Sequence, residues 1–214
     1  MTAAGIDAAY VAHYTRAPER LGALDGAMRT IAASAYVVAA FDKEEMTGAD
    51  IACINRQDQK RALTPGEVSL SAKHYVAYAD VARRRARYAL VLEDDAAFEP
   101  GFVDSMQSVM AMVDRVDADL VFVGGCIGLV ASAPVLDAVG GLSLHKSNTS
   151  RCTHAYIVSL QGARKMLDLL PMEDPIDWHI NTESLRLNMF WVEPPLVLQN
   201  GTMPRTGIRS ARRL

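Results

Sequence analysis

Short apolar runs alternate with segments of helical periodicity along most of this chain. The runs cover residues 8–14, 35–40, 88–92, 120–123 and 153–159. After the first run, Leu21, Leu24, Met28 and Ile31 recur at helical spacing, with Pro18 in the first turn. Strand, helix and strand at this spacing predict a βαβ unit. The chain as a whole is predicted to be an α/β protein with helices flanking a sheet.

The helix predicted to begin at Pro65 has the clearest local signals. Thr64 precedes Pro65, and Glu67 follows three residues after Thr64, which is the pattern of a capping box. The basic run 83–87 suits the negative end of the helix dipole, where we expect the helix to end. Its predicted apolar face is Val68, Ala72, Tyr75, Val76, Ala79 and Ala82.

Further helices are predicted from Pro100 to Val113 and from a Ser159 cap to Pro171. Residues 42–63 are predicted to be a loop with at most a short helix. Residues 126–151 are predicted to be irregular, with one or two short strands.

The candidate chemistry lies where the apolar run Tyr88–Leu92 meets Glu93, Asp94 and Asp95. Three adjacent acids repel one another, and burying them unpaired is costly. At the carboxyl end of a buried strand they would face a crevice where a cation can neutralise them. Glu93 and Asp95 point the same way in an extended segment, so they are the predicted metal ligands. The alternative is a solvated turn after the strand.

Composition narrows the functional class. The chain has 214 residues, of which 50% are hydrophobic and 22% charged, with a net charge of −3. This is a globular composition with no overall attraction to nucleic acid. No apolar run approaches the roughly 20 residues of a membrane span. The three cysteines are odd in number and far apart, which predicts neither a disulfide nor a zinc site and favours a reducing cytoplasm.

Several segments, in order, resemble glycosyltransferase family 25, which makes lipopolysaccharide sugars and includes collagen galactosyltransferases. The acidic motif Leu92–Asp95 resembles the metal-binding motif of that family, and Leu63–Val68 with His74 resembles its Leu-Thr-x-Gly-Glu-Ile segment and histidine. Later matches are Thr153–Ile157, Gly162–Ala163, Asp177–Trp178 and Pro194–Val197. The chain departs from the family at His13–Tyr14, usually Asn-Leu, and at Lys73, usually Ser.

This resemblance implies a GT-A-like fold, a Rossmann-like mixed sheet, over residues 1–214 as a single domain. Residues 8–125 would form the nucleotide-sugar half, 126–208 the acceptor half and 209–214 a basic tail. The implied cofactors are Mn²⁺ or Mg²⁺ and a nucleotide sugar such as UDP-galactose. The residues expected to contact the donor are Tyr14, Arg20, Glu67, Asp94, Gly124 and Gly125. The two glycines would allow backbone or ligand to approach closely.

The implied reaction is inverting transfer of a hexose to a glycan acceptor such as lipopolysaccharide. Asp177 is the candidate base, because it stands beside Trp178 and partial desolvation would raise its basicity. The alternative is that it caps a helix beginning at Trp178, in which case Asp174 or Glu183 could be the base instead. His74 is a catalytic candidate or a histidine beside the core. Arg20 contacts the donor or is a surface charge.

Two other functions remain open. One is a relative that binds the nucleotide sugar but has lost catalysis, which the departures from the family motivate. The other is a metal-dependent phosphatase or nucleotidyl enzyme. This function is less favoured, because the sequence has no second acid cluster that could form a two-metal site. The predicted location is the cytoplasm, where the basic tail suits contact with phosphate groups or the anionic inner membrane surface. The alternative is that the tail is solvated and disordered.

Overall fold

The computed structural model describes residues 5–56, 62–126, 129–183 and 186–199. In this part of the chain, eight strands form one mixed sheet in the order β2-β1-β3-β8-β5-β9-β7-β6. These strands are β1 (Ile6–Ala12), β2 (Ala32–Val38), β3 (Tyr88–Glu93), β5 (Leu120–Phe122), β6 (Val135–Val139), β7 (Leu142–Ser147), β8 (Ala155–Ser159) and β9 (Met189–Glu193). The predicted α/β architecture with a Rossmann-like mixed sheet is confirmed.

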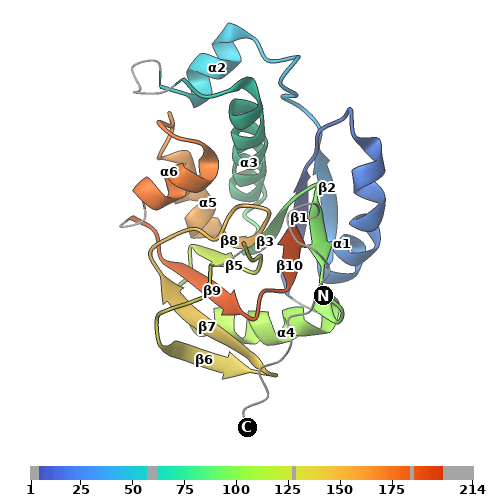
Figure 1. Cartoon of the computed structure of the whole chain (residues 1–214), viewed down its shortest axis with the longest axis vertical. Helices are drawn as coiled ribbons and strands as arrows, with labels where there is room; N and C mark the ends of the chain where they lie inside the picture. Colours follow the sequence, from blue (N-terminus) through green and yellow to red (C-terminus); the bar gives the residue numbers. More distant parts are fainter. Residues whose placement is uncertain (1–4, 57–61, 127–128, 184–185, 200–214) are drawn as a thin grey trace.

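Helices cover both faces of this sheet (Figure 1). They are the 3₁₀ helix η1 (Pro18–Ala23) and the α-helices α1 (Asp25–Ile31), α2 (Gly48–Ile54), α3 (Pro65–Arg84), α4 (Phe102–Val113), α5 (Leu160–Leu167) and α6 (Ile176–Thr182). The α1 and α4 helices pack on one face, and α2, α3, α5 and α6 on the other. No helix in the described ranges is both long and apolar enough to cross a membrane.

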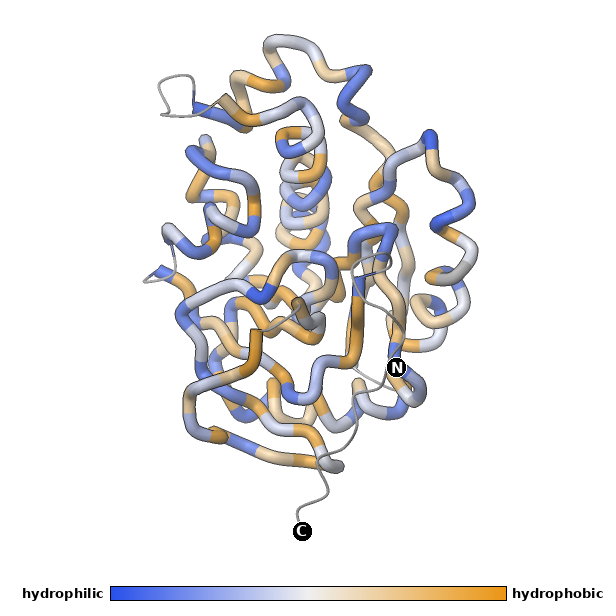
Figure 2. The backbone as a smooth tube through the Cα atoms, in the orientation of Figure 1, coloured by the Kyte–Doolittle hydropathy of each residue, from blue (hydrophilic) through white to orange (hydrophobic). Residues whose placement is uncertain are grey.

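The central strand β3 is buried from both sides, as its apolar sequence predicts. Leu90 and Leu92 point into the core under α1 and α4, whereas Ala89 and Val91 point into the core under α3. In Figure 2 the orange of hydrophobic residues gathers on the central strands of the sheet. The strand is parallel to β1 and antiparallel to β8.

The predicted βαβ unit is present. The η1 and α1 helices connect β1 to β2, and the two strands pair in parallel from Ile6↔Ala32 to Ala12↔Val38. The predicted strands in residues 126–151 are the hairpin β6–β7. A second sheet of two short strands, β4 (Ala96–Phe98) and β10 (Val197–Gln199), was not predicted, and neither was β9.

The α3 helix corrects the predicted apolar face. Ala79 is exposed, whereas Lys73 and His74 are buried together with Val68 and Ala72. The helix packs against α2, α5 and α6 as well as against the sheet, so most of its circumference is covered and a single stripe does not describe it. The basic tail at residues 209–214 lies outside the described residues.

The capping box on α3 is confirmed. Thr64 Oγ1 accepts a hydrogen bond from the backbone N of Glu67 at 3.3 Å, and Glu67 Oε2 accepts one from the backbone N of Thr64 at 2.7 Å. The helix ends at Arg84, followed by Arg85 in a left-handed conformation.

We expect Thr64→Ala to lower the free energy of unfolding by about 1 kcal/mol, the usual loss for an N-cap. Denaturant unfolding measures it, with Thr30→Ala as a matched exposed threonine that caps no helix end. A stability loss no larger than that of the control, with weakened ligand binding instead, would contradict the capping role.

Candidate functional site

The candidate site lies where the parallel strands β1, β2 and β3 end. His13 and Tyr14 follow β1, Asp42 lies beyond β2, and Glu93 ends β3. Because β8 runs antiparallel to β3, the residues that precede it arrive at the same edge of the sheet. The backbone N of Glu93 donates to the carbonyl of His154 at 3.0 Å, which joins the two segments there. This edge is where ligands bind in open α/β sheets.

The middle acid, Asp94, is fully used in holding the end of β1. Its Oδ2 accepts from the backbone N of Tyr14 and faces the Nδ1 of His13, both at 2.9 Å, and its Oδ1 accepts from Arg20 at 3.1 Å. Asp94 and His13 are both buried. Asp94 therefore fixes the Tyr14 backbone and the Arg20 side chain, and contact between Asp94 and a donor stays a prediction.

The first acid, Glu93, turns toward β8 and α3. Thr153 Oγ1 donates to Glu93 Oε1 at 2.8 Å, and His74 Nε2 lies 3.7 Å from the same oxygen. Burial alone would raise the pKa of Glu93, but the contacts with His74 and Thr153 outweigh it and hold the pKa below its usual value. The carboxylate is thus kept ionised.

His74 stands behind Glu93 rather than in a cavity. It is completely buried, and its Nδ1 lies 2.8 Å from the hydroxyl of Tyr156. The predicted alternative of a histidine beside the core describes this position, and any influence on chemistry would pass through Glu93.

The third acid, Asp95, is left least satisfied. Its Oδ2 accepts from Gln199 Nε2 at 2.9 Å, while its Oδ1 is buried with no hydrogen-bond partner among the described residues. Burial raises the pKa of Asp95, and the nearby charge of Glu93 raises it further. A buried, unpartnered carboxylate oxygen beside a second ionised carboxylate is a donor set that fits a hard divalent cation.

Two cavities adjoin Glu93. The first, here called the β1 cavity, measures about 250 Å³. Its polar lining includes Tyr14, Arg20, Lys43, Lys73, Asp94 and Asp95. The second, here called the α6 cavity, measures about 320 Å³. Its polar lining includes Glu67, Ser71, Thr153, His154, Asp177 and Gln199. Glu93 and Leu70 line both, so the two cavities meet at these residues.

Asp177 lies in the first turn of α6, one residue inside the helix. The helix begins at Ile176 after Pro175, so the alternative that Asp177 caps a helix beginning at Trp178 is wrong. Burial raises the pKa of Asp177, and the charges of Glu93 and Glu67 raise it further, although backbone hydrogen bonds oppose them. A raised pKa makes the carboxylate a stronger base. Trp178 beside it is 64% exposed.

Of the predicted donor contacts, Tyr14 and Arg20 line the β1 cavity, whereas Glu67 lines the α6 cavity. The Tyr14 hydroxyl donates to Glu44 at 2.7 Å, and the Lys43 ammonium lies 5.1 Å from the Tyr14 ring centroid. Donor binding by these residues stays a prediction, with Tyr14 and Arg20 placed around one cavity.

Close contacts within the protein explain the two glycines after β5. A side chain at Gly124 would meet His154 at 2.5 Å, and one at Gly125 would meet Pro195 at 2.6 Å. The close approach expected at these positions is therefore made by the protein itself, and neither glycine lines the two cavities.

Comparison with known proteins identifies the family of this chain. Residues 7–123 match the model of glycosyltransferase family 25, described as an LPS biosynthesis protein, and this is more than half of the chain. The chain belongs to glycosyltransferase family 25. The match includes Arg20, His74 and the three acids, and it ends before Asp177.

Individual relatives of this chain have names that agree with this family. A glycosyltransferase 25 family member of Aedes aegypti is 32% identical over 56% of this chain and 20% of its own length. Procollagen galactosyltransferase 1-B of Xenopus laevis is 30% identical over 64% and 25%. A protein of Rattus norvegicus named probable inactive glycosyltransferase 25 family member 3 is 27% identical over 81% and 32%. The chain thus spans a fifth to a third of these relatives.

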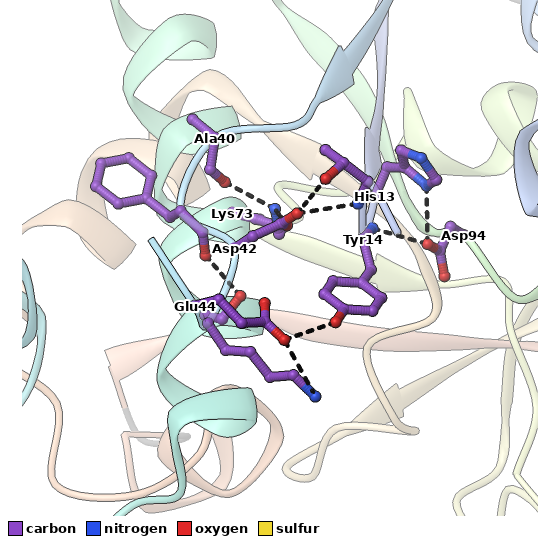
Figure 3. A network of polar contacts seen from close by, with 11 residues as sticks. His13, Tyr14, Ala40, Asp42, Glu44, Lys73 and Asp94 are labelled. Carbon is purple, nitrogen blue, oxygen red and sulfur yellow. Dashed lines mark hydrogen bonds and ion pairs between the residues drawn. The ribbon is translucent and has the colours of Figure 1, made fainter. Parts of the chain in front are cut away.

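A buried ion pair involves Lys73, at the position where the family resemblance predicts a serine. Lys73 Nζ donates to Asp42 Oδ1 and to the carbonyl of Ala40, both at 2.7 Å, and Figure 3 shows the three groups together. Asp42 Oδ2 also accepts from the backbone N and the hydroxyl of Thr15. The side chains of Lys73 and Asp42 are 4% and 2% exposed. The pair therefore fastens α3 to the segments after β1 and β2.

The structure also corrects the expectation of no disulfide. Cys126 and Cys152 are joined, with Cα atoms 6.3 Å apart, while Cys53 is free and exposed. Their separation of 26 residues hid the pairing, because only the neighbouring ends of β5 and β8 bring them together.

Sequence reasoning missed several site residues. His13, Asp42, Thr153, His154 and Gln199 were not assigned roles. The departures at His13 and Lys73 were visible signals, but the partners of these residues are distant in sequence, such as Gln199 with Asp95 across 104 positions.

We expect Lys73→Met to lower the free energy of unfolding by about 3–5 kcal/mol, because it leaves the Asp42 charge buried without its cation. Adding Asp42→Asn should recover part of this loss, since the uncompensated charge is then gone. Denaturant unfolding of both single variants and the double variant gives the coupling. If Lys73→Met lowers the free energy of unfolding by less than about 1 kcal/mol, the role assigned to the ion pair is contradicted.

We expect Asp95→Asn to raise the melting temperature at neutral pH, by about 2–4 °C for each kcal/mol of repulsion relieved. The raised pKa means that the folded state holds this proton more tightly than the unfolded state. Stability from the protonated form is thus present below the ordinary value of 3.8 and is lost as pH rises through the raised pKa.

The control is Asp94→Asn, which should instead lower the melting temperature, because both Asp94 oxygens accept bonds from the protein. Thermal unfolding between pH 3 and pH 7 compares the variants. Equal destabilisation by both substitutions would contradict the different environments assigned to the two acids.

Proposed function

We propose that this family 25 chain is a metal-dependent, inverting glycosyltransferase that moves a hexose from a nucleotide sugar to a glycan. The observation that carries the proposal is Asp95 Oδ1, which is buried without a hydrogen-bond partner among the described residues. Asp95 lines the β1 cavity beside ionised Glu93, where the two cavities meet. Glu93 and Asp95 would hold Mn²⁺ or Mg²⁺. When bound, the ion supplies positive charge that stabilises a departing diphosphate.

The β1 cavity suits the donor. Its cations Arg20 and Lys43 offer guanidinium and ammonium groups to phosphate oxygens, and Asp94 orients Arg20. Tyr14 adds an aromatic ring to the wall. We propose UDP-galactose as the donor, since relatives of this chain are named procollagen galactosyltransferases.

The α6 cavity suits the acceptor. Asp177 would remove the proton from the attacking hydroxyl, and its half-buried position favours that role because desolvation raises its pKa. The exposed ring of Trp178 can lie against a sugar face. Because the cavities meet at Glu93, donor and acceptor would react there in one displacement, which inverts the anomeric carbon.

The family description motivates lipopolysaccharide or another surface glycan as the acceptor. The proposed location is the cytoplasm, with the basic tail at the inner membrane surface. In the reducing cytoplasm, Cys126 and Cys152 would be thiols rather than the disulfide seen in the structure.

A second candidate is a relative that binds the nucleotide sugar without transferring it. Two observations favour it: relatives aligned over 81% of this chain are named probable inactive members, and Lys73 replaces the usual serine in the β1 cavity. Hydrolysis of the donor separates the two candidates, because a pure binder releases no nucleoside diphosphate.

The test is a panel of nucleotide sugars incubated with the purified chain, with Mn²⁺, with Mg²⁺ or with chelator. We expect metal-dependent release of UDP from UDP-galactose. Asp95→Asn should abolish that release while the protein remains folded. Full release in chelator, or in the variant, would overturn the metal assignment.

With a productive acceptor, Asp177→Asn should lower the transfer rate by roughly 10²- to 10⁴-fold, the usual worth of a general base. Donor affinity by calorimetry should be unchanged, because Asp177 lies outside the β1 cavity. Asp174→Asn is the matched control: it removes a neighbouring acid that lines neither the β1 nor the α6 cavity. Near-normal transfer by Asp177→Asn would remove Asp177 from the mechanism.

A further inference from the structure

Three potential metal ligands of a different kind lie next to the carboxylate site. One ligand atom from each of Cys126, Cys152 and His154 falls within 4.8 Å of the others. Cys126 follows the two glycines after β5, and the other two residues precede β8, which pairs with β5. The cluster is therefore built on neighbouring strand ends.

His154 has the hydrogen bonding of a metal ligand. Its Nε2 lies 3.2 Å from the carbonyl oxygen of Val197, which can only accept, so Nε2 carries the proton. In the neutral ring Nδ1 then keeps its lone pair, and Nδ1 is buried with no hydrogen-bond partner in the described parts of the chain. A ligating histidine commonly donates its other N–H to a backbone carbonyl in this way.

The segment around Cys152 is held on both sides. Cys152 has a φ of +59°, which a residue with a side chain seldom adopts without support. Before it, buried Arg151 pairs with Glu193 at 2.8 Å and donates to the carbonyl of Val192. After it, Thr153 donates to Glu93. The sulfur of Cys152 is thus placed by a fixed backbone.

We propose that, once the Cys126–Cys152 disulfide is reduced, this cluster binds a thiophilic divalent cation of the Zn²⁺ class. Reduction takes two electrons and two protons from a dithiol, which becomes a disulfide itself. The cation then displaces the thiol protons and is bound by two thiolates and the Nδ1 of His154. Zinc–sulfur bonds of about 2.3 Å require the sulfurs to lie about 3.8 Å apart in a tetrahedral site.

The site is distinct from the carboxylate site in its chemistry. Thiolate and imidazole favour zinc, whereas the carboxylates Glu93 and Asp95 favour Mg²⁺ or Mn²⁺. Cys152 and His154 both line the α6 cavity. Three protein ligands leave a coordination position open, as in zinc sites that accept a water or substrate group.

The experiment uses Co²⁺ as a spectroscopic substitute for zinc, added to the full chain after dithiol reduction and removal of the reductant. We expect a thiolate-to-cobalt charge-transfer band that Zn²⁺ abolishes by competition. The oxidised protein should not show it. Asp95→Asn should keep the band, because an all-oxygen site contributes no thiolate absorption, and this separates the proposal from the carboxylate site.

Cys126→Ser should abolish the two-thiolate spectrum, and His154→Gln should weaken Co²⁺ binding by more than about 10-fold. Cys53→Ser, which removes the exposed free thiol, is the matched control and should change neither. Melting curves identify a variant that fails to fold, in which case the reduced native protein decides the result. A reduced native protein without the band, or a band lost in Cys53→Ser, would overturn the proposal.

Discussion

The arrangement of this site depends on one constraint: three consecutive carboxylates at the end of a buried strand cannot share an environment. The structure directs each toward a different neighbour. Asp94 is bonded to Arg20 and the end of β1, Glu93 to Thr153 before β8, and Asp95 to Gln199 on β10. Each acid therefore bonds to a different segment of the chain at this edge of the sheet. The two cavities form between these segments.

Local signals account for the parts of the fold that the sequence predicted. The capping box at Thr64 and the apolar run of β3 involve residues only a few positions apart, so they can be recognised in the sequence. The short strands β4 and β10 have three residues each, and their pairing partner is about 100 positions away. The start of α6 was misplaced because Asp177 suits both a cap and a first-turn position, and the chain before it decides between them.

The residues of the site also fall into two groups: those predicted from the sequence and those that only the fold brings together. The acids were predicted as site residues from their position after the strand, and Tyr14 and Arg20 were predicted as donor contacts, which stays a prediction. What the sequence could not give is the second set of partners, which folding brings in from far away: His13 meets Asp94 across 81 positions and Thr153 meets Glu93 across 60. These contacts decide which acid is neutralised and which is left with an unpartnered oxygen. A motif of three acids therefore predicts a metal site without identifying which oxygen would bind the proposed metal.

Residues 152–154 connect the two chemistries of this edge. Cys152 and His154 belong to the sulfur cluster, while Thr153 between them holds Glu93, and the His154 carbonyl accepts from the Glu93 backbone. This segment is not extended, since Cys152 has a φ of +59°, and its bent backbone lets Thr153 bond to Glu93 while Cys152 and His154 contribute to the cluster with Cys126. Parting the two sulfurs must move the Cys152 backbone or rotate its side chain. A movement of the backbone would reach Glu93, because the Thr153 hydroxyl and the His154 carbonyl both bond to it, whereas a side-chain rotation would leave Glu93 in place.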